Sequence, residues 1–217
     1  MTLLSTPMRT AGTVVAGIDV GAPRKGYHAV ILRGTHVVAK FHSCEPATMA
    51  RWCAEQGAVV VAVDAPCRWR APDRPARAAE RELAANRISC FSTPTEAKAR
   101  GHAFYTWMLA GEELYNALAP RYPLYAGDAQ RSGVAMETFP QAVACALAGE
   151  RVSAKNKLAI RTRLLMRAGL EVSAFDHIDE IDAALCAIAA QHFVMNHYKA
   201  YGNADSGYII VPFPARK

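Results

Sequence analysis

The sequence lacks two features that would assign it to a familiar class at once. No apolar run approaches the ~20 residues of a membrane-spanning helix, and no two cysteines form the Cys-x-x-Cys pair typical of structural zinc sites. The cysteines lie singly, as Cys44, Cys53, Cys67, Cys90, Cys145 and Cys186. We therefore expect no membrane partner and no zinc knuckle, and we expect free thiols in a protein of the reducing cytoplasm.

Acidic residues are fewer than basic ones. The chain has 25 Lys and Arg against 19 Asp and Glu, a formal net charge of +6. A moderate positive excess suits a polyanionic partner, such as nucleic acid or another phosphate-bearing ligand. With 217 residues, 52% of them hydrophobic, the chain is long enough for one large domain. We place this domain at residues 13–217, after a flexible tail at 1–12.

The first part of the chain predicts a strand meander followed by a crossover. Apolar, β-branched runs and one Pro-initiated segment predict strands at Val14–Val20, Tyr27–Arg33 and His36–His42, a helix at Pro46–Gln56 and a strand at Ala58–Val63. Only Gly34-Thr35 joins the second and third strands, which predicts a type II′ hairpin turn. Because the fourth strand follows a helical crossover, we expect it to run parallel to an earlier strand.

The rest of the chain predicts a helical insertion and then further α/β structure. Residues 65–132 are rich in proline and predict an insert with helices at Arg74–Asn86 and Ala103–Leu118. Beyond the insert, the pattern predicts a strand at Val134–Glu137, helices at Pro140–Ala148, Ala154–Ala168 and Ile178–Asn196, and a last strand at Tyr208–Val211. The order β-β-β-α-β-insert-β-α-α-α predicts a mixed α/β sheet rather than a run of βαβ repeats.

Four carboxylates are candidates for chemistry. Asp19 lies near the end of the first strand, Asp64 at the end of the fourth and Glu137 at the end of the next. If the first and fourth strands are parallel neighbours, they lie about 4.8 Å apart. The carboxyl ends of such strands meet at one edge of a sheet, so we expect these three acids to converge. Asp182 lies on the apolar face of the last helix, where an acid is costly to bury alone.

Several carboxylates at one point repel one another, and a divalent metal is the simplest way to hold them ionised. Hard oxygen ligands favour Mg²⁺ or Mn²⁺. We therefore expect Asp19, Asp64 and Asp182 to bind such an ion, with Glu137 as a further ligand or as the base that positions a water.

Each acid also has an ordinary structural interpretation. Asp19 can cap the turn at Gly21, and Asp64 before Ala-Pro can be a turn residue. A Glu at a strand end, such as Glu137, is usually solvated, and Asp182 can pair with a Lys or Arg. The joint pattern is more specific than any one of its members.

Short motifs in a fixed order connect these acids to a known family. The segments GIDVG, AVDAP, METFP and DEIDAALCA, with a closing GYIIVP, resemble the bacterial and archaeal domain-of-unknown-function 429 family over roughly residues 14–212. Members of that family are described as predicted nucleases of ribonuclease-H fold. The resemblance therefore implies a ribonuclease-H-like mixed sheet and a metal-dependent site at Asp19, Asp64, Glu137 and Asp182. The closing segment departs from the family pattern at Ser206 and Tyr208.

Two basic segments are candidates for phosphate contacts. Six arginines lie between positions 68 and 87, and the resemblance places the family's arginine-containing segment on Arg77, Glu80 and Arg81. We take Arg68, Arg77 and Arg81 as substrate-binding candidates because guanidinium forks suit phosphates; the alternative is a solvated helix with ion pairs. Residues 151–167 hold six basic residues and no acid, and they either track phosphates or form an ordinary exposed helix. The insert also carries aromatic side chains that either stack on bases or pack as a lid core: Phe104, Tyr105, Trp107 and Tyr115.

Three functions fit these patterns. The first is a Mg²⁺- or Mn²⁺-dependent nuclease, a hydrolase of nucleic-acid phosphodiesters. The second is a non-catalytic module that binds nucleic acid or another phosphate ligand on the same fold. The third is a phosphotransferase of the actin and sugar-kinase type, suggested by GIDVG, although Ala22-Pro23 stand where such enzymes usually have a hydroxyl residue.

Overall fold

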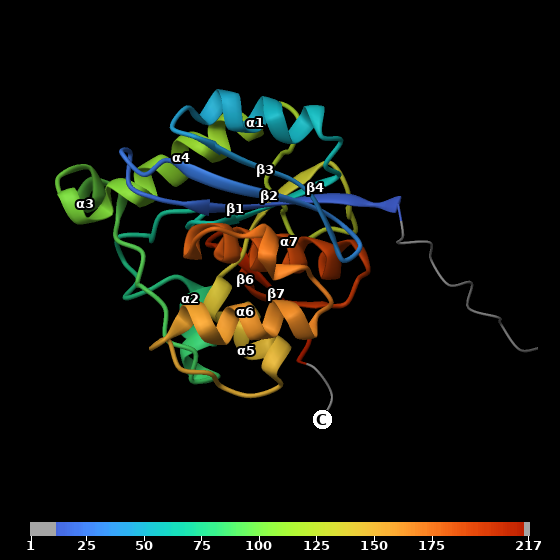
Figure 1. Ribbon diagram of the computed structural model, residues 1–217. Coiled ribbons are helices and arrows are strands. Elements are labelled where there is room, and N and C mark those ends of the chain that lie inside the picture. The colour runs from blue at the N-terminus through green and yellow to red at the C-terminus, as the bar shows by residue number, and fades with distance from the viewer. Residues whose placement is uncertain (1–11, 215–217) are drawn as a thin grey trace, which may run out of the picture.

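The computed structural model describes residues 12–214, and within them seven strands form one mixed sheet (Figure 1). The strands are β1 (Val14–Val20), β2 (Tyr27–Arg33), β3 (His36–Ser43), β4 (Val60–Asp64), β5 (Val134–Glu137), β6 (Tyr198–Asn203) and β7 (Gly207–Pro212). Their order across the sheet is β3-β2-β1-β4-β5-β7-β6. Apart from Gly12, the predicted tail at 1–12 lies outside the described residues.

The sheet combines an antiparallel meander with a parallel centre. β1, β2 and β3 pair antiparallel, whereas β4 pairs parallel to β1, β5 to β4 and β7 to β5. β6 pairs antiparallel with β7 at the edge. β1 is buried along its whole length, as its continuous apolar run requires of a strand covered on both faces. The prediction that the fourth strand runs parallel to an earlier strand is confirmed, and that strand is β1.

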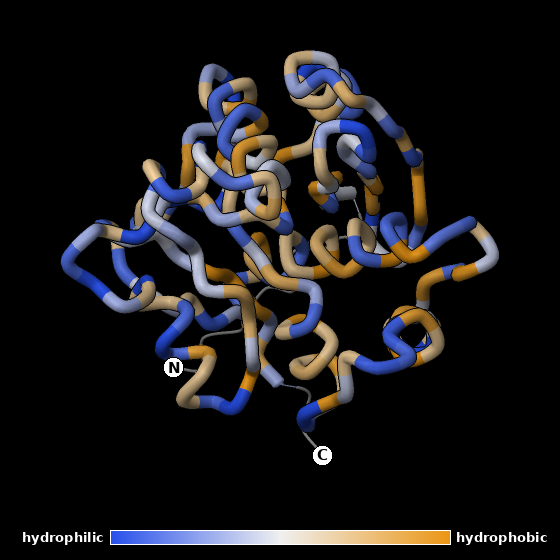
Figure 2. The backbone as a smooth tube through the Cα atoms, turned by 90° about the vertical axis from the view of Figure 1, so that its left-hand side faces the viewer, coloured by the Kyte–Doolittle hydropathy of each residue, from blue (hydrophilic) through white to orange (hydrophobic). Residues whose placement is uncertain are grey.

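Helices cover both faces of this sheet. They are α1 (Pro46–Glu55), α2 (Ala78–Ala85), α3 (Glu96–Arg100), α4 (Thr106–Leu118), α5 (Pro140–Ala148), α6 (Lys157–Arg167) and α7 (Ile178–Val194), with short 3₁₀ turns η2 (Ala103–Tyr105) and η3 (Val172–Ala174). In Figure 1, α1 and α4 lie above the sheet, while α7 lies below it, with α5 and α6 beneath α7. In Figure 2 many outer loops are hydrophilic, and hydrophobic residues recur along the inner segments.

Helix α7 lies directly on the centre of the sheet. A Cβ atom added to Gly17 of β1 would come within 2.1 Å of both the Ala183 carbonyl oxygen and the Ala187 nitrogen. Only glycine permits this close approach of helix to strand. The contact fixes the position of the middle of α7 relative to the middle of β1.

The order of elements confirms the predicted mixed α/β sheet, with the helical insertion between β4 and β5. The insert helix predicted from Arg74 begins later, at Ala78, because the residue before Pro75 is disfavoured in a helix. The helix predicted from Ala154 begins at Lys157, since Asn156 takes a left-handed φ of 55°. Gly34 has a φ of 60° while Thr35 has no positive φ, as the predicted type II′ turn requires.

Two elements were not predicted. β6 is a short edge strand with polar residues, and α3 is a five-residue helix capped by the Thr95 hydroxyl, which accepts a hydrogen bond from the Lys98 nitrogen at 3.4 Å. In the described part of the chain, no helix combines the length and apolarity needed to cross a membrane.

Candidate active site at the carboxyl edge of the sheet

Asp19 and Asp64 lie side by side at the carboxyl ends of β1 and β4. They are direct register partners in the parallel pairing of these strands, so their side chains leave the same face of the sheet. Asp19 is buried and Asp64 is half-buried. Within residues 12–214, no hydrogen bond or ion pair satisfies either carboxylate.

This carboxylate pair faces α7. Gly17 and Asp19 share one face of β1 because side chains alternate along a strand, and Gly17 contacts α7. Asp182, in the first turns of α7, is buried near the pair. One of its oxygens accepts a hydrogen bond from Arg161, and the other lies 3.3 Å from the Lys157 ammonium. The ordinary interpretation of Asp182, a paired buried acid, therefore describes the contacts that it makes.

Glu137 points to the opposite face of the sheet. It is the register partner of Val63, one residue before Asp64, so strand alternation places its side chain on the α4 side. Thr138, the residue that follows β5, lies on the face of Asp64, and its hydroxyl donates to the Ile210 carbonyl at 2.7 Å. The three strand-end acids therefore meet at one cavity of the sheet edge, and Glu137 reaches it from the face opposite to Asp19 and Asp64.

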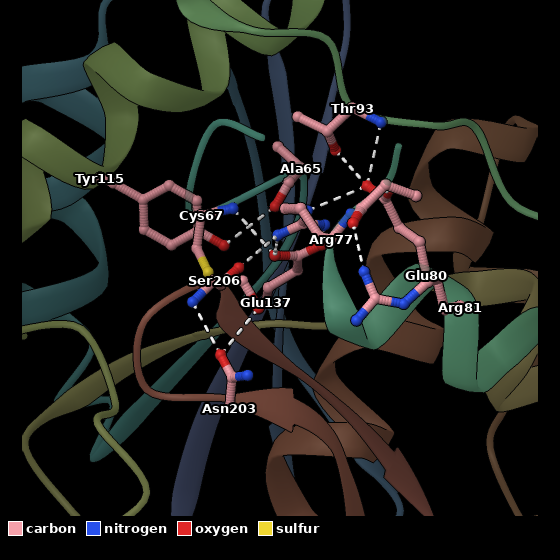
Figure 3. A network of polar contacts seen from close by, with 11 residues as sticks. Ala65, Cys67, Arg77, Glu80, Arg81, Thr93, Tyr115, Glu137, Asn203 and Ser206 are labelled. Carbon is pink, nitrogen blue, oxygen red and sulfur yellow. Dashed lines mark hydrogen bonds and ion pairs between the residues drawn. The ribbon is translucent and has the colours of Figure 1, made fainter. Parts of the chain in front are cut away.

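Both oxygens of Glu137 are occupied by hydrogen-bond donors (Figure 3). The Arg77 guanidinium forms a bidentate pair with it, at 2.7 and 2.5 Å, and the Cys67 backbone N–H donates to it at 2.9 Å. Such fork-to-carboxylate pairs combine two charge-assisted hydrogen bonds in one plane. Glu137 is therefore held as a buried, fully paired carboxylate.

Arg77 also ties the insert to the sheet through Glu80. Its Nε lies 2.9 Å from a Glu80 oxygen, and that same oxygen accepts from the Thr93 backbone N–H at 2.9 Å and from the Thr93 hydroxyl. Arg77 and Glu80 are both almost completely buried. The guanidinium thus bridges two carboxylates from different parts of the chain. Its predicted role in substrate binding stays a prediction, and the contacts assign it a structural task.

The other two predicted substrate arginines lie outside the cavity formed by these acids. Arg81 is exposed on α2 and donates to the Ala76 carbonyl at 2.8 Å, and Arg68 is exposed in the loop after β4. Neither lines that cavity. Their role in substrate binding also stays a prediction.

A cavity of about 550 Å³ opens at this edge of the sheet. It is lined by all four predicted acids, although Glu137 reaches it from the other face. Cationic side chains of three elements line it as well: Lys25, Arg77, Lys157 and Arg161. The volume lies within the range of small-molecule and cofactor sites.

The pKa values of the two unpaired carboxylates, Asp19 and Asp64, are raised. Burial, and then the neighbouring Asp182 and Asp179, raise the pKa of Asp19 from 3.8 to about 7. Burial, and then Asp19 and Asp182, raise the pKa of Asp64 well above its usual value, although Arg161 opposes the shift. Strongly perturbed carboxyl groups in a cleft are typical of functional sites.

The donor chemistry of this cluster fits a hard divalent cation. Asp19 and Asp64 offer oxygen ligands with no competing partner, and their mutual repulsion is what a bound cation relieves. Within residues 12–214, however, no three His, Cys, Asp or Glu side chains form a ready metal-binding group. The third predicted ligand, Asp182, is turned toward Arg161 and Lys157 instead.

Several residues of this site had only a weak signal in the sequence. Arg161 and Lys157 belong to the acid-free segment 151–167, for which an exposed helix was one interpretation, yet Arg161 is buried. Its side chain also donates to the side-chain amide oxygen of Gln141 at 3.1 Å. Lys25 forms an ion pair of 2.6 Å with Asp179, and Phe91 lines the cavity from the loop after α2. Spacing in the sequence does not indicate that these residues meet.

Comparisons with known proteins assign the chain to a family. A family model described as "Protein of unknown function (DUF429)" matches residues 17–206. The chain belongs to this family. The matched segment contains all four predicted acids and the whole insert, residues 65–132. It confirms the resemblance seen in the sequence motifs.

No curated protein matches the chain. Among solved structures, the Thermus thermophilus RuvC structure is similar, with 18% sequence identity over 85% of this chain and 97% of that chain and a TM-score of 0.39. A likeness at this level transfers no activity to the DUF429 chain.

Proposed function

We propose that this DUF429 protein is a divalent-metal-dependent nuclease that hydrolyses phosphodiesters of nucleic acid. The observation that supports this most directly is the pair Asp19 and Asp64: register partners at the carboxyl edge, with no hydrogen bond or ion pair to the rest of residues 12–214. A pair of carboxylates kept without a hydrogen-bonded partner costs stability, and such a cost is typical of sites selected for function.

In this proposal Asp19 and Asp64 are the principal ligands of Mg²⁺ or Mn²⁺, and Asp182 is the third. Asp182 would exchange its contacts with Lys157 and Arg161 for the metal. A bound divalent ion supplies a water of lowered pKa and stabilises a leaving oxygen. Glu137 takes no direct part, because Arg77 and the Cys67 N–H occupy its oxygens.

Cations at the cavity would hold the phosphate. Lys157 and Arg161 lie on α6 beside Asp182, and Lys25 lies beyond the end of β1. On release of Asp182, the Arg161 guanidinium has donors free for a phosphate oxygen, as its planar fork suits. The net charge of +6 favours a polyanionic substrate. A cytoplasmic location belongs to the proposal as well, and all six cysteines are free thiols.

The alternative is a non-catalytic module that binds nucleic acid or another phosphate ligand. The observation that favours it is the Asp182 contact with Arg161 and Lys157, in which protein cations occupy the place of a metal. In such a module the two cations would remain where they are, and the ligand's phosphate would approach them without hydrolysis.

The proposal is tested by cleavage and by metal binding together. DNA and RNA oligonucleotides are incubated with the protein and Mg²⁺ or Mn²⁺, and thermal unfolding is followed in parallel. We expect cleavage only with the metal, and we expect Mn²⁺ to raise the Tm of the wild type. At 100 times its Kd, a ligand stabilises a protein by about 2.7 kcal/mol.

The double variant Asp19→Asn, Asp64→Asn is expected to lose both responses. Asp205→Asn, an exposed acid in the β6–β7 turn, is the matched control and should keep both. Unchanged cleavage by the double variant would refute the assigned site. Nucleic-acid binding without metal binding or cleavage would instead support the non-catalytic module.

A further inference from the structure

An aromatic cluster stands at the rim of the cavity that contains the acid pair. Phe91, in the loop between α2 and α3, and Trp107, in the first turn of α4, both line this cavity. Phe104 of η2 is the third member, with its ring centroid 5.8 Å from that of Phe91. Phe91 is 64% exposed and Phe104 is 52% exposed, which is unusual for side chains of this size.

The members of the cluster differ in how far they are buried. Trp107, like Tyr115 of α4, packs partly against the core, and Tyr115 also donates a hydrogen bond to the Ala65 carbonyl at 3.1 Å. Phe91 and Phe104 are instead exposed. Phe91 meets its neighbours Phe104 and Trp107 at interplanar angles of 66° and 62°, so neither ring stacks in parallel on it. Within the described chain, most of the Phe91 ring is therefore left for contact with another molecule.

The residues that line the cavity indicate which chemical groups such a molecule carries. Carboxylates Asp19 and Asp64 and the cation Lys157 lie on its sheet and α6 sides, and Phe91 and Trp107 lie on its insert side. A phosphate suits the cation and a flat apolar ring suits the aromatics. A nucleotide carries both groups, and the volume of about 550 Å³ is large enough for one.

We propose that Phe91 and Trp107 form a stacking platform for an unpaired base of a nucleic-acid strand whose backbone passes Asp19 and Asp64. The substrate would then be single-stranded or locally unpaired nucleic acid. In a continuous duplex both faces of each base are covered by neighbouring bases, and a base reaches such a platform only after unstacking. The inference deepens the proposed nuclease function and rests on it for the role of the acid pair, but binding to the platform requires no metal.

The test is a binding measurement in EDTA, where no metal-dependent cleavage occurs. Fluorescence anisotropy follows a labelled 20-nucleotide single strand and a blunt duplex that contains the same strand. We expect the wild type to bind the single strand more tightly. Aromatic stacking is worth roughly 5- to 150-fold in affinity per base. Phe91→Leu keeps an apolar side chain without the π-face, and it should lose at least about fivefold for the single strand and nothing for the duplex.

Phe213→Leu is the matched control, because Phe213 is an exposed aromatic that does not line this cavity. It should leave both affinities unchanged. Equal affinities of the wild type for strand and duplex, or a Phe91→Leu variant with wild-type affinity for the single strand, would overturn the platform. Competition by a nucleoside monophosphate as effective as the 20-mer would overturn the strand as the occupant, in favour of a free nucleotide.

The two proposals fail separately. If the strand preference and its loss in Phe91→Leu are found but no metal cleaves the strand, the platform stands and the nuclease is refuted. If Mn²⁺ supports cleavage that depends on Asp19 while strand and duplex bind equally, the nuclease stands and the platform is refuted.

Discussion

Two groups of acids lie on opposite faces of the same sheet edge, and they differ in their hydrogen-bond partners. On the α4 side, Glu137 and Glu80 are bridged by Arg77 and receive further N–H and hydroxyl donors. On the α7 side, Asp19 and Asp64 have no hydrogen-bonded partner among the described residues. The fully satisfied group holds the insert in place, while the unsatisfied group retains capacity for a ligand.

The difference indicates how to separate structural from functional carboxylates in this chain. A buried acid with complete hydrogen bonding is stabilised as an anion, and it needs no further partner. The pKa of Asp19 is instead raised to about 7, chiefly by burial. The following changes test whether this contrast is real.

The largest effect is expected from Arg77→Ala. The substitution removes the shared partner of Glu137 and Glu80 and leaves two carboxylates buried without it. Breaking a buried ion pair in this way costs about 3–5 kcal/mol. Urea unfolding at pH 7 measures the loss, and Arg81→Ala, an exposed arginine on the same helix, should cost less than about 0.5 kcal/mol. A small loss at Arg77 would mean that the network does not hold the insert.

The next effect concerns Asp19 and pH. The folded protein keeps a proton on Asp19 up to about pH 7, whereas the unfolded chain releases it near the ordinary pKa of 3.8. Folding therefore takes up a proton in this window, and the free energy of unfolding falls as the pH rises from about 4 to 7. Asn mimics the protonated acid, so Asp19→Asn should flatten this slope and stabilise the protein at pH 8 by up to about 4 kcal/mol.

Unfolding curves at several pH values between 4 and 8 measure this slope. Asp205→Asn should retain the wild-type slope, because Asp205 is exposed and has no place in the cavity. If Asp19→Asn has the same slope as the wild type, Asp19 does not keep its proton in the folded protein between pH 4 and 7. The proposed contrast between the two faces would then be lost.

The smallest effect is expected from Lys157→Gln. Lys157 lowers the pKa of Asp19 and pairs with Asp182 at 3.3 Å, but its side chain is 46% exposed. Partly exposed pairs contribute less than about 1 kcal/mol, so global stability should change little. The pH at which the Asp19 slope ends should move upward. A downward shift would show that Lys157 does not act on the carboxylate pair.

Much of the fold could be predicted from local patterns. β1 and β5 have the predicted ends, and the meander, the crossover to β4 and the position of α7 follow from apolar runs and turn residues. β6 escaped prediction because Tyr198–Asn203 has no apolar alternation, and its strand conformation depends on pairing with β7 at the edge. The helix of Lys157–Arg167 was predicted, but its buried arginine was not.

The candidate site also has a part that could be predicted from the sequence and a part that could not. That Asp19 and Asp64 lie together could be derived from the sequence, because both end strands joined by one crossover and a parallel neighbour aligns strand ends. That Glu137 faces away could not be derived, because a register shift of one residue reverses every side chain of a strand and no local pattern sets it here. The aromatic rim depends on how the insert folds over the sheet edge.

By itself, the sequence determined the α/β class, the order of the elements and the identities of the acids, since these follow from periodicity, turn chemistry and short motifs. Only the tertiary structure decided which acids are paired. Arg77 lies 60 residues from Glu137 and Arg161 lies 21 residues from Asp182, and only packing brings these partners within hydrogen-bonding distance. The strength of an electrostatic interaction depends on the distance between the charges in space and not on their separation in the sequence. Asp19 and Asp64 differ from the other acids because, among the described residues, no donor forms a hydrogen bond or ion pair with them.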